Sequence, residues 1–320
     1  MILKQASQLA TSAERVKQLI LACHNFSDTM GTLPPWAIGT TTQNASAHYL
    51  ILPFLEQNTV FQQANGFSYN VRTIPIKAFT CPDDPTTKNG LFTGQAVAYI
   101  NSQARTSDNG KPYGAATYAI NAQVATAFLN AGHPTKGTTT LEKIKDGTSN
   151  TVLFAERMAW CTGPNYPSPA ATPRLAGGSV TWSIWARGGR NTTTSPWADG
   201  AAAATLPPAE NTAGPNGYSW WDCPLFDHPY ISATSKDNGP GPRSDPNFRQ
   251  NRDGVVNPGG IQGGAIPNQC DYRRLQALHT GVMTAGIADG SVRSINANIS
   301  ALTFQRVGTK DEGEVLGGDW

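Results

Sequence analysis

The sequence predicts an α+β protein in which one long N-terminal helix lies across an antiparallel sheet. Residues 3–26 repeat apolar side chains at three- and four-residue intervals, which is the period of an amphipathic helix. From residue 74 onward the pattern changes to short apolar or alternating runs that end at Gly, Pro, Asn and Asp. The chain also holds 32 Gly and 23 Pro among 320 residues, which indicates many turns between short strands.

The first expected element is the helix over residues 3–26, in which Lys, Gln, Glu and Arg occupy the positions between the apolar ones. Gly31 and the Pro34-Pro35 pair end it, because glycine and proline interrupt helical backbone. The apolar stripe that we expect to pack against the sheet consists of Leu9, Ala13, Val16, Leu19 and Ile20.

A short second helix is expected at residues 55–64, after the apolar run 49–54. Strands are expected at residues 96–101, 117–121, 151–156, 180–185, 282–288 and 291–295. Two pairs, Asp146-Gly147 and Asp289-Gly290, each precede an apolar run. They predict tight turns, because Asp-Gly supports the positive φ angles that such turns require.

The expected organisation is a helix at residues 1–30, a sheet core at 31–160 and 268–320, and an insertion at 161–267. The insertion is rich in Pro, Gly and Trp and is expected to form short strands and loops. Its flat tryptophan faces could stack on sugar rings or fill a partner's pocket. The ligand candidates are Trp182, Trp185, Trp220 and Trp221, although filling of the core is the favoured interpretation of these side chains.

Composition excludes several classes of function. The 24 Lys and Arg residues nearly balance 22 Asp and Glu, so the net charge of +2 provides no broad basic field for nucleic acid. The chain has no nucleophile elbow, no phosphate-binding loop, no C-x-x-C pair and no histidine pair spaced for zinc. The five cysteines lie far apart, without an obvious catalytic partner, and their disulfide pairing stays open. We therefore expect a protein that is not an enzyme, and we assign no catalytic residue.

His279 and Asp289 are the most suggestive pair for a metal or for acid–base chemistry. If residues 282–288 form one strand, ten steps of about 3.3 Å place the two side chains near opposite ends. We therefore expect Asp289 to belong to a hairpin turn and His279 to satisfy backbone groups where the strand begins. Glu156 is expected to be a buried or half-buried acid that ties its strand to a loop.

Several blocks occur in a characteristic order along the chain. They are residues 21–26 (LACHNF), 51–57 (ILPFLEQ), 79–85 (FTCPDDP), 117–121 (TYAIN), 146–156 (DGTSNTVLFAE), and His279 followed after nine residues by Asp289-Gly290. Together they resemble a large family of prepilin-type, pseudopilin-like proteins of planctomycete-like bacteria. The family motif positions in this sequence are Asp146, Gly147, Asn150, Glu156, His279, Asp289 and Gly290.

The resemblance implies a structural subunit, a pseudopilin or pilin-like component of a cell-envelope filament or secretion apparatus of the type II secretion or type IV pilus kind. Its partners would be copies of itself or other pilin-like subunits, at the periplasmic or cell-surface side. The apolar anchor of such proteins is missing here, so membrane contact is expected only through such a segment. The alternative is an envelope-tethered solute- or carbohydrate-binding protein that uses the insertion tryptophans.

No cofactor is expected except calcium, which some pseudopilins bind near the C-terminal part of the sheet. Carboxylates could supply its oxygen ligands, but no dense D-x-D-x-D-G loop is present, and solvated turn carboxylates are the favoured interpretation. The acidic residues considered are Asp83, Asp84, Asp146, Glu156, Asp289, Asp311, Glu312 and Glu314.

Overall fold

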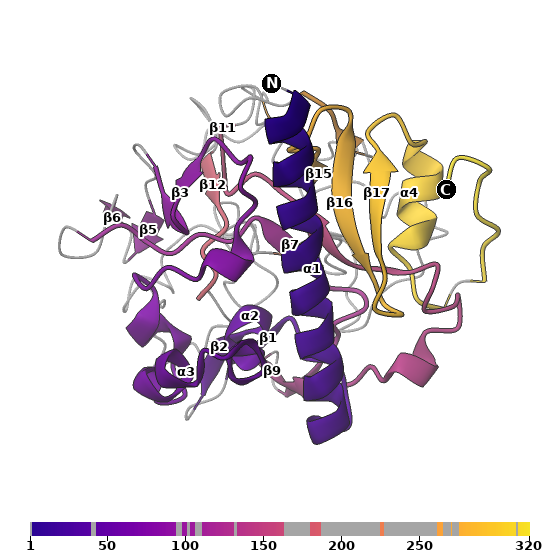
Figure 1. Cartoon of the computed structure of the whole chain (residues 1–320). Coiled ribbons are helices and arrows are strands. Elements are labelled where there is room, and N and C mark those ends of the chain that lie inside the picture. The colour runs from indigo at the N-terminus through magenta and orange to yellow at the C-terminus, as the bar shows by residue number, and fades with distance from the viewer. Residues whose placement is uncertain are drawn as a thin grey trace, which may run out of the picture.

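The structure, a computed structural model, describes residues 2–39, 43–93, 98–100, 103–105, 111–130, 133–162, 180–186, 225–226, 261–264, 270, 275–311 and 313–320. Its fold class is α+β, which confirms the prediction. A long N-terminal helix, α1, lies across a central sheet whose strands come from distant parts of the chain (Figure 1).

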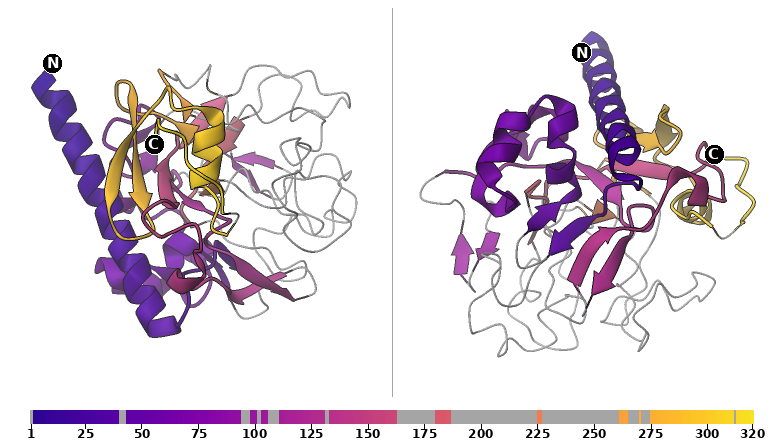
Figure 2. Two further views of the ribbon diagram at one scale, coloured as in Figure 1. Left: turned by 90° about the vertical axis from the view of Figure 1, so that its right-hand side faces the viewer. Right: turned by 90° about the horizontal axis from the view of Figure 1, so that it is seen from below.

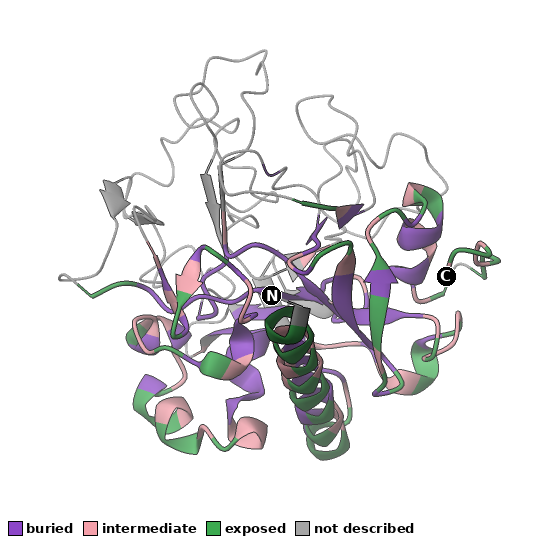
Figure 3. Cartoon of the chain, turned by 45° about the horizontal axis from the view of Figure 1, so that its top comes forward, coloured by how far each residue is buried: buried purple, intermediate pink, exposed green. Residues whose placement is uncertain are grey.

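Helix α1 spans Ile2–Met30, which is 29 residues and therefore longer than the predicted helix. It ends where Gly31 adopts a positive φ of 75°. Within the predicted stripe, Val16, Leu19 and Ile20 are fully buried, whereas Leu9 and Ala13 are half-buried. Figure 3 shows this division, with an exposed outer face along α1 and a buried face toward the sheet.

The central sheet has the described strand order β13-β7-β10-β16-β17. Its strands are β7 (Tyr118–Asn121), β10 (Val152–Glu156), β13 (Leu225–Phe226), β16 (Val282–Ile287) and β17 (Val292–Asn296). All neighbours pair antiparallel except β13, which runs parallel to β7. The sheet is therefore antiparallel, as predicted, except at this edge, where residues 225–226 return beside β7 from far along the chain.

The sheet separates two hydrophobic layers. One face packs against α1, and the other packs against α4 (Ala301–Val307), a C-terminal helix that the sequence patterns did not predict (Figure 2). Ser300 caps α4, since its side chain accepts a hydrogen bond from the Thr303 N–H. The sheet is therefore covered on both faces.

Smaller elements surround this core. The remaining helices are α2 (Ala47–Leu50) and α3 (Asn58–Ala64), with 3₁₀ turns at Leu52–Leu55, Ser68–Val71, Lys77–Phe79 and Leu141–Lys143. The predicted helix at 55–64 begins later because the backbone turns at Glu56, whose φ is 59°. Among the described residues, six two-stranded sheets pair β1 (Ala37–Gly39) with β2 (Asn44–Ser46), β3 (Thr87–Lys88) with β4 (Leu91–Phe92), β5 (Ala98–Ile100) with β6 (Gln103–Arg105), β8 (Ala127–Asn130) with β9 (His133–Gly137), β11 (Trp160–Thr162) with β12 (Val180–Trp182), and β14 (Ile261–Gln262) with β15 (Leu275–Gln276).

Most of the expected insertion at 161–267 lies outside the described residues. The strand expected at 180–185 ends at Trp182. Trp185 follows it and is fully buried in the core, where its indole N–H donates a 2.8 Å hydrogen bond to the carbonyl of Ile74. Cys270 takes part in a disulfide, whereas Cys23 and Cys81 are free and buried.

Helix α1 approaches the sheet most closely at Gly286 of β16. A Cβ atom at this position would lie 2.3 Å from Ile20 Cδ1 and 2.8 Å from Val16 Cγ1, so any side chain would push the helix away. We expect Gly286→Ala to lower the free energy of unfolding by about 1–3 kcal/mol, as overpacked cores do. Urea denaturation measures this loss. Gly318→Ala is the control, because nothing lies within 4 Å of its added Cβ. Equal stabilities of the two variants would contradict the close helix–sheet contact.

Candidate functional site

The two Asp-Gly turns lie side by side at one end of the sheet. Gly147 and Gly290 both adopt a φ of 93°, and the Asp289 N–H donates a 3.0 Å hydrogen bond to the carbonyl of Thr148. The carboxylate of Asp146 accepts hydrogen bonds from the Gly313 N–H at 2.7 Å and the Thr309 hydroxyl at 2.9 Å. The first turn therefore makes hydrogen bonds both to the C-terminal segment and to the second turn.

Helix α1 holds the second turn from the other side. Lys17 Nζ donates a 2.6 Å hydrogen bond to the carbonyl of Gly290, and His24 Nε2 lies 2.9 Å from the carbonyl oxygen of Ala288. Asp289 accepts a 2.8 Å hydrogen bond from the Ser291 N–H, so its carboxylate stabilises the turn itself. At this end of the sheet, the motif residues make a joint between helix, turns and C-terminus.

Asn150 belongs to the same joint, because its amide Nδ2 donates a 3.3 Å hydrogen bond to the backbone carbonyl of Asp146. Asp289 lies just beyond one end of β16, and His279 lies shortly before the other end. The structure thus does not bring these two motif residues together.

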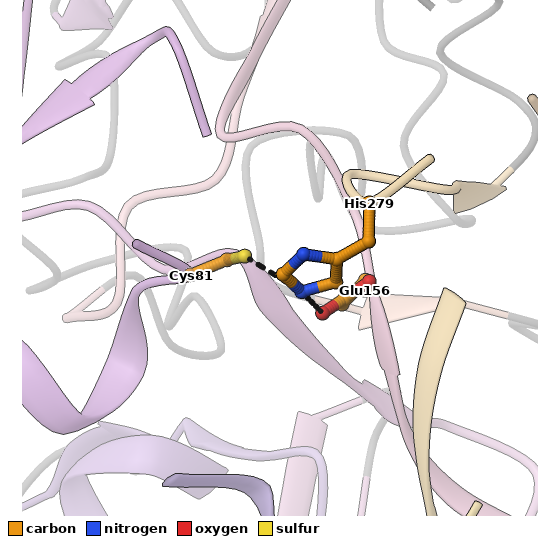
Figure 4. A group of neighbouring side chains, drawn as sticks. All are labelled: Cys81, Glu156 and His279. Atoms are coloured by element: carbon orange, nitrogen blue, oxygen red, sulfur yellow. Dashed lines mark hydrogen bonds and ion pairs between the residues drawn. The ribbon is translucent and has the colours of Figure 1, made fainter. Parts of the chain in front are cut away.

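His279 lies in a cluster of side chains from distant segments (Figure 4). Its Nδ1 is 2.7 Å from Asp83 Oδ2, its Nε2 is 3.1 Å from Glu156 Oε1, and Cys81 Sγ is 3.6 Å from the same Nε2. The expectation that this imidazole satisfies backbone groups is therefore wrong. Both of its nitrogens face side chains, because the loop before β16 folds over residues 81–83.

Glu156, the last residue of β10, is completely buried. Its Oε1 accepts a 2.6 Å hydrogen bond from the Ser12 hydroxyl, and its Oε2 accepts a 2.9 Å hydrogen bond from the Thr284 N–H. Ser12 also lies 2.9 Å from the Tyr118 hydroxyl. Glu156 is therefore buried, as expected, and ties its strand to helix α1, to strand β16 and, through His279, to the loop before β16.

The electrostatics favour a charged imidazole in this cluster. Burial by itself would lower the pKa of His279, but the hydrogen bonds and negative charges of Glu156 and Asp83 outweigh it and raise the pKa above its ordinary value. Burial, reinforced by the charge of Glu156, raises the pKa of the Cys81 thiol well above its ordinary value. Because the thiolate is the nucleophilic form, burial disfavours the nucleophilic form of Cys81.

The arrangement can instead do two things. It can neutralise charges inside the protein, with one imidazolium between two carboxylates, and it can offer donor atoms to a metal ion. One donor atom each from Cys81, Glu156 and His279 lies within 4.8 Å of the others. Sequence reasoning missed this group, including the free cysteine that the sequence left without a partner. The signal that could have indicated a buried polar group here is Ser12, a polar residue one turn before Val16 on the buried side of the helix.

The other predicted site residues lie elsewhere. Trp185 belongs to the core, as the favoured interpretation of the tryptophans held, and the side chains of Trp182, Trp220 and Trp221 lie outside what the structure describes. The acidic residues considered for calcium do not form one group. Asp84 and Glu156 are buried, so these two are not solvated turn carboxylates, whereas Glu314 is exposed and lies 3.7 Å from the Arg306 guanidinium.

Fold and site together define a class: an α+β protein whose N-terminal helix is joined to the sheet by paired turns at one end and by a buried polar cluster at the other. The chain belongs to the family SBP_bac_10, described as a protein of unknown function (DUF1559), whose family model matches residues 4–302. No curated protein matches the chain, and no solved structure matches it. Among the described helices, none is long and apolar enough to cross a membrane.

Proposed function

We propose that the protein is a pilin-like structural subunit of a cell-envelope filament or secretion apparatus and that it is not an enzyme. The observation that carries this proposal is the arrangement of α1. Its middle part packs against the sheet through Ser12, Val16 and Ile20, and Phe26 near its C-terminal end packs on Phe54. Residues 3–7 are exposed, and the N-terminal end extends beyond the sheet (Figure 2). In a helix arranged in this way, the packed part holds the sheet and its covering elements, and the exposed N-terminal part is free to contact neighbouring subunits.

One further observation supports an envelope protein. Disulfides such as that of Cys270 persist mainly in oxidising compartments, which include the periplasm and the cell surface.

A cross-linking experiment in the native cells tests this proposal. We expect Leu3→Cys, at a position that is 87% exposed, to give covalent dimers of this protein with a short bismaleimide, since one new thiol per chain can join only two chains. The control is Val315→Cys, which is 81% exposed but lies on the C-terminal segment, and which should remain monomeric. The wild-type chain measures the background from native cysteines. Absence of dimers, when both new thiols react with a monofunctional maleimide, would refute assembly through α1.

The alternative, an envelope-tethered solute- or carbohydrate-binding protein, depended on exposed tryptophans. Trp185 cannot contribute to such a surface, because its side chain is fully buried. No observation among the described residues favours the remaining three, so the pilin-like role stays the better supported proposal.

A further inference from the structure

The geometry points to a site for a divalent transition metal ion such as zinc, bound by Cys81, Glu156 and His279. These residues follow the 3₁₀ turn Lys77–Phe79, end β10 and precede β16, respectively. They are separated by up to 198 positions along the chain, yet their three donor atoms lie within 4.8 Å of one another. The proposal does not depend on whether the protein assembles into a filament.

The distances suit a tetrahedral ion. Zinc bonds of about 2.0–2.2 Å to nitrogen and oxygen and about 2.3 Å to sulfur place ligand atoms roughly 3.4–3.6 Å apart at tetrahedral angles. The observed separations are 3.1 Å from His279 Nε2 to Glu156 Oε1 and 3.6 Å from His279 Nε2 to Cys81 Sγ. Only small side-chain movements would therefore be needed to enclose an ion.

The imidazole is held in the orientation that metal sites use. Metal-binding histidines usually donate their second ring N–H to a carboxylate, which fixes the tautomer and strengthens the donor nitrogen. Here His279 Nδ1 lies 2.7 Å from Asp83 Oδ2, while Nε2 points to the other two candidate ligands. Asp83 is thus placed as a positioning residue.

The ligand types select the class of metal. Thiolate and imidazole favour zinc and similar transition metals, whereas calcium and magnesium prefer oxygen ligands throughout. A thiolate and a carboxylate together neutralise a divalent cation, which suits a site whose protein ligands are all buried. Binding would displace the proton of the Cys81 thiol and the proton on His279 Nε2, so uptake of metal should release protons.

Three protein ligands leave one position for water or another small ligand. Thr284 lies opposite Glu156 across the β10–β16 pair, since the neighbouring residues Ala155 and Ala285 are paired. Its hydroxyl is buried and has no hydrogen-bond partner among the described residues. A cavity of about 510 Å³, lined by Asp83, His279 and the first turns of α1, lies beside the cluster.

The test uses the full chain, purified without a histidine tag, stripped of metal with a chelator, and then loaded with either Zn²⁺ or Co²⁺ and freed of excess metal. We expect one zinc ion per chain by elemental analysis, and we expect Co²⁺ to give the near-ultraviolet absorption band of thiolate-to-cobalt charge transfer. Cys81→Ser should lose this band and weaken zinc binding by at least about 100-fold. Asp83→Asn should keep the band but weaken binding by about 10–100-fold, the effect typical of a residue that orients a ligand.

Cys23→Ser is the matched control, because Cys23 is the other described free cysteine and is equally buried. It should keep both the zinc and the cobalt band. The cobalt spectrum of the wild-type chain needs no variant, so a variant that fails to fold does not weaken the test. A wild-type chain without the band, or a band that Cys23→Ser removes and Cys81→Ser retains, would overturn the assignment and leave a hydrogen-bonded cluster only.

Discussion

Glu156→Ala is expected to lower the free energy of unfolding by about 3–5 kcal/mol, the loss typical when one partner of a buried charge pair is removed. The carboxylate accepts hydrogen bonds from the Ser12 hydroxyl and the Thr284 N–H and faces His279. Alanine would leave all three groups buried without this acceptor. Urea denaturation in the presence of a chelator measures the effect, so that metal binding does not contribute to it.

Two variants sharpen this experiment. Glu142→Ala removes an exposed carboxylate and should change stability by no more than about 0.5 kcal/mol. Glu156→Gln keeps the volume but replaces one acceptor oxygen by a donor group, and its loss should fall between those of the two alanine variants. If Glu156→Ala were as stable as Glu142→Ala, the buried cluster would not join α1 to the sheet.

Val16→Asp is expected to have an effect of similar size, about 3–5 kcal/mol, because it places an unpaired charge between α1 and β16. Val16 is completely buried, and its side chain lies against Gly286. The melting temperature and the urea midpoint report the loss.

Leu21→Asp provides the comparison for Val16→Asp. It introduces the same side chain into the same helix at a position that is 45% exposed, so it should change stability by only about 0.5 kcal/mol. Unchanged melting of Val16→Asp would show that this face of α1 is not packed against the sheet.

Much of the fold follows from local patterns. The apolar period of α1 identifies the side that Val16, Leu19 and Ile20 bury, and the short apolar runs identify the strands β7, β10, β16 and β17 closely. The Asp-Gly pairs mark real positive-φ turns at Gly147 and Gly290. Each of these features depends on residues that are neighbours in sequence, which is why a pattern can reveal it.

Other features depend on contacts between distant segments. The parallel pairing of β13 with β7, and the meeting of the two Asp-Gly turns, need chain returns that no local pattern encodes. Helix α4 was missed because seven residues are too few to show a clear helical period, and packing against the sheet supplies its stability.

The candidate site shows the same division most clearly. The sequence by itself determined that Glu156 is buried at the end of a strand and that His279 precedes the next apolar strand of the sheet. Only the tertiary structure decided that Cys81, Asp83, Glu156 and His279 meet, because the sheet order brings the end of β10 beside the start of β16 and α1 closes over both. Burying these polar groups without partners would cost more free energy than the fold could offset, so each is matched across segments by a donor, an acceptor or an opposite charge.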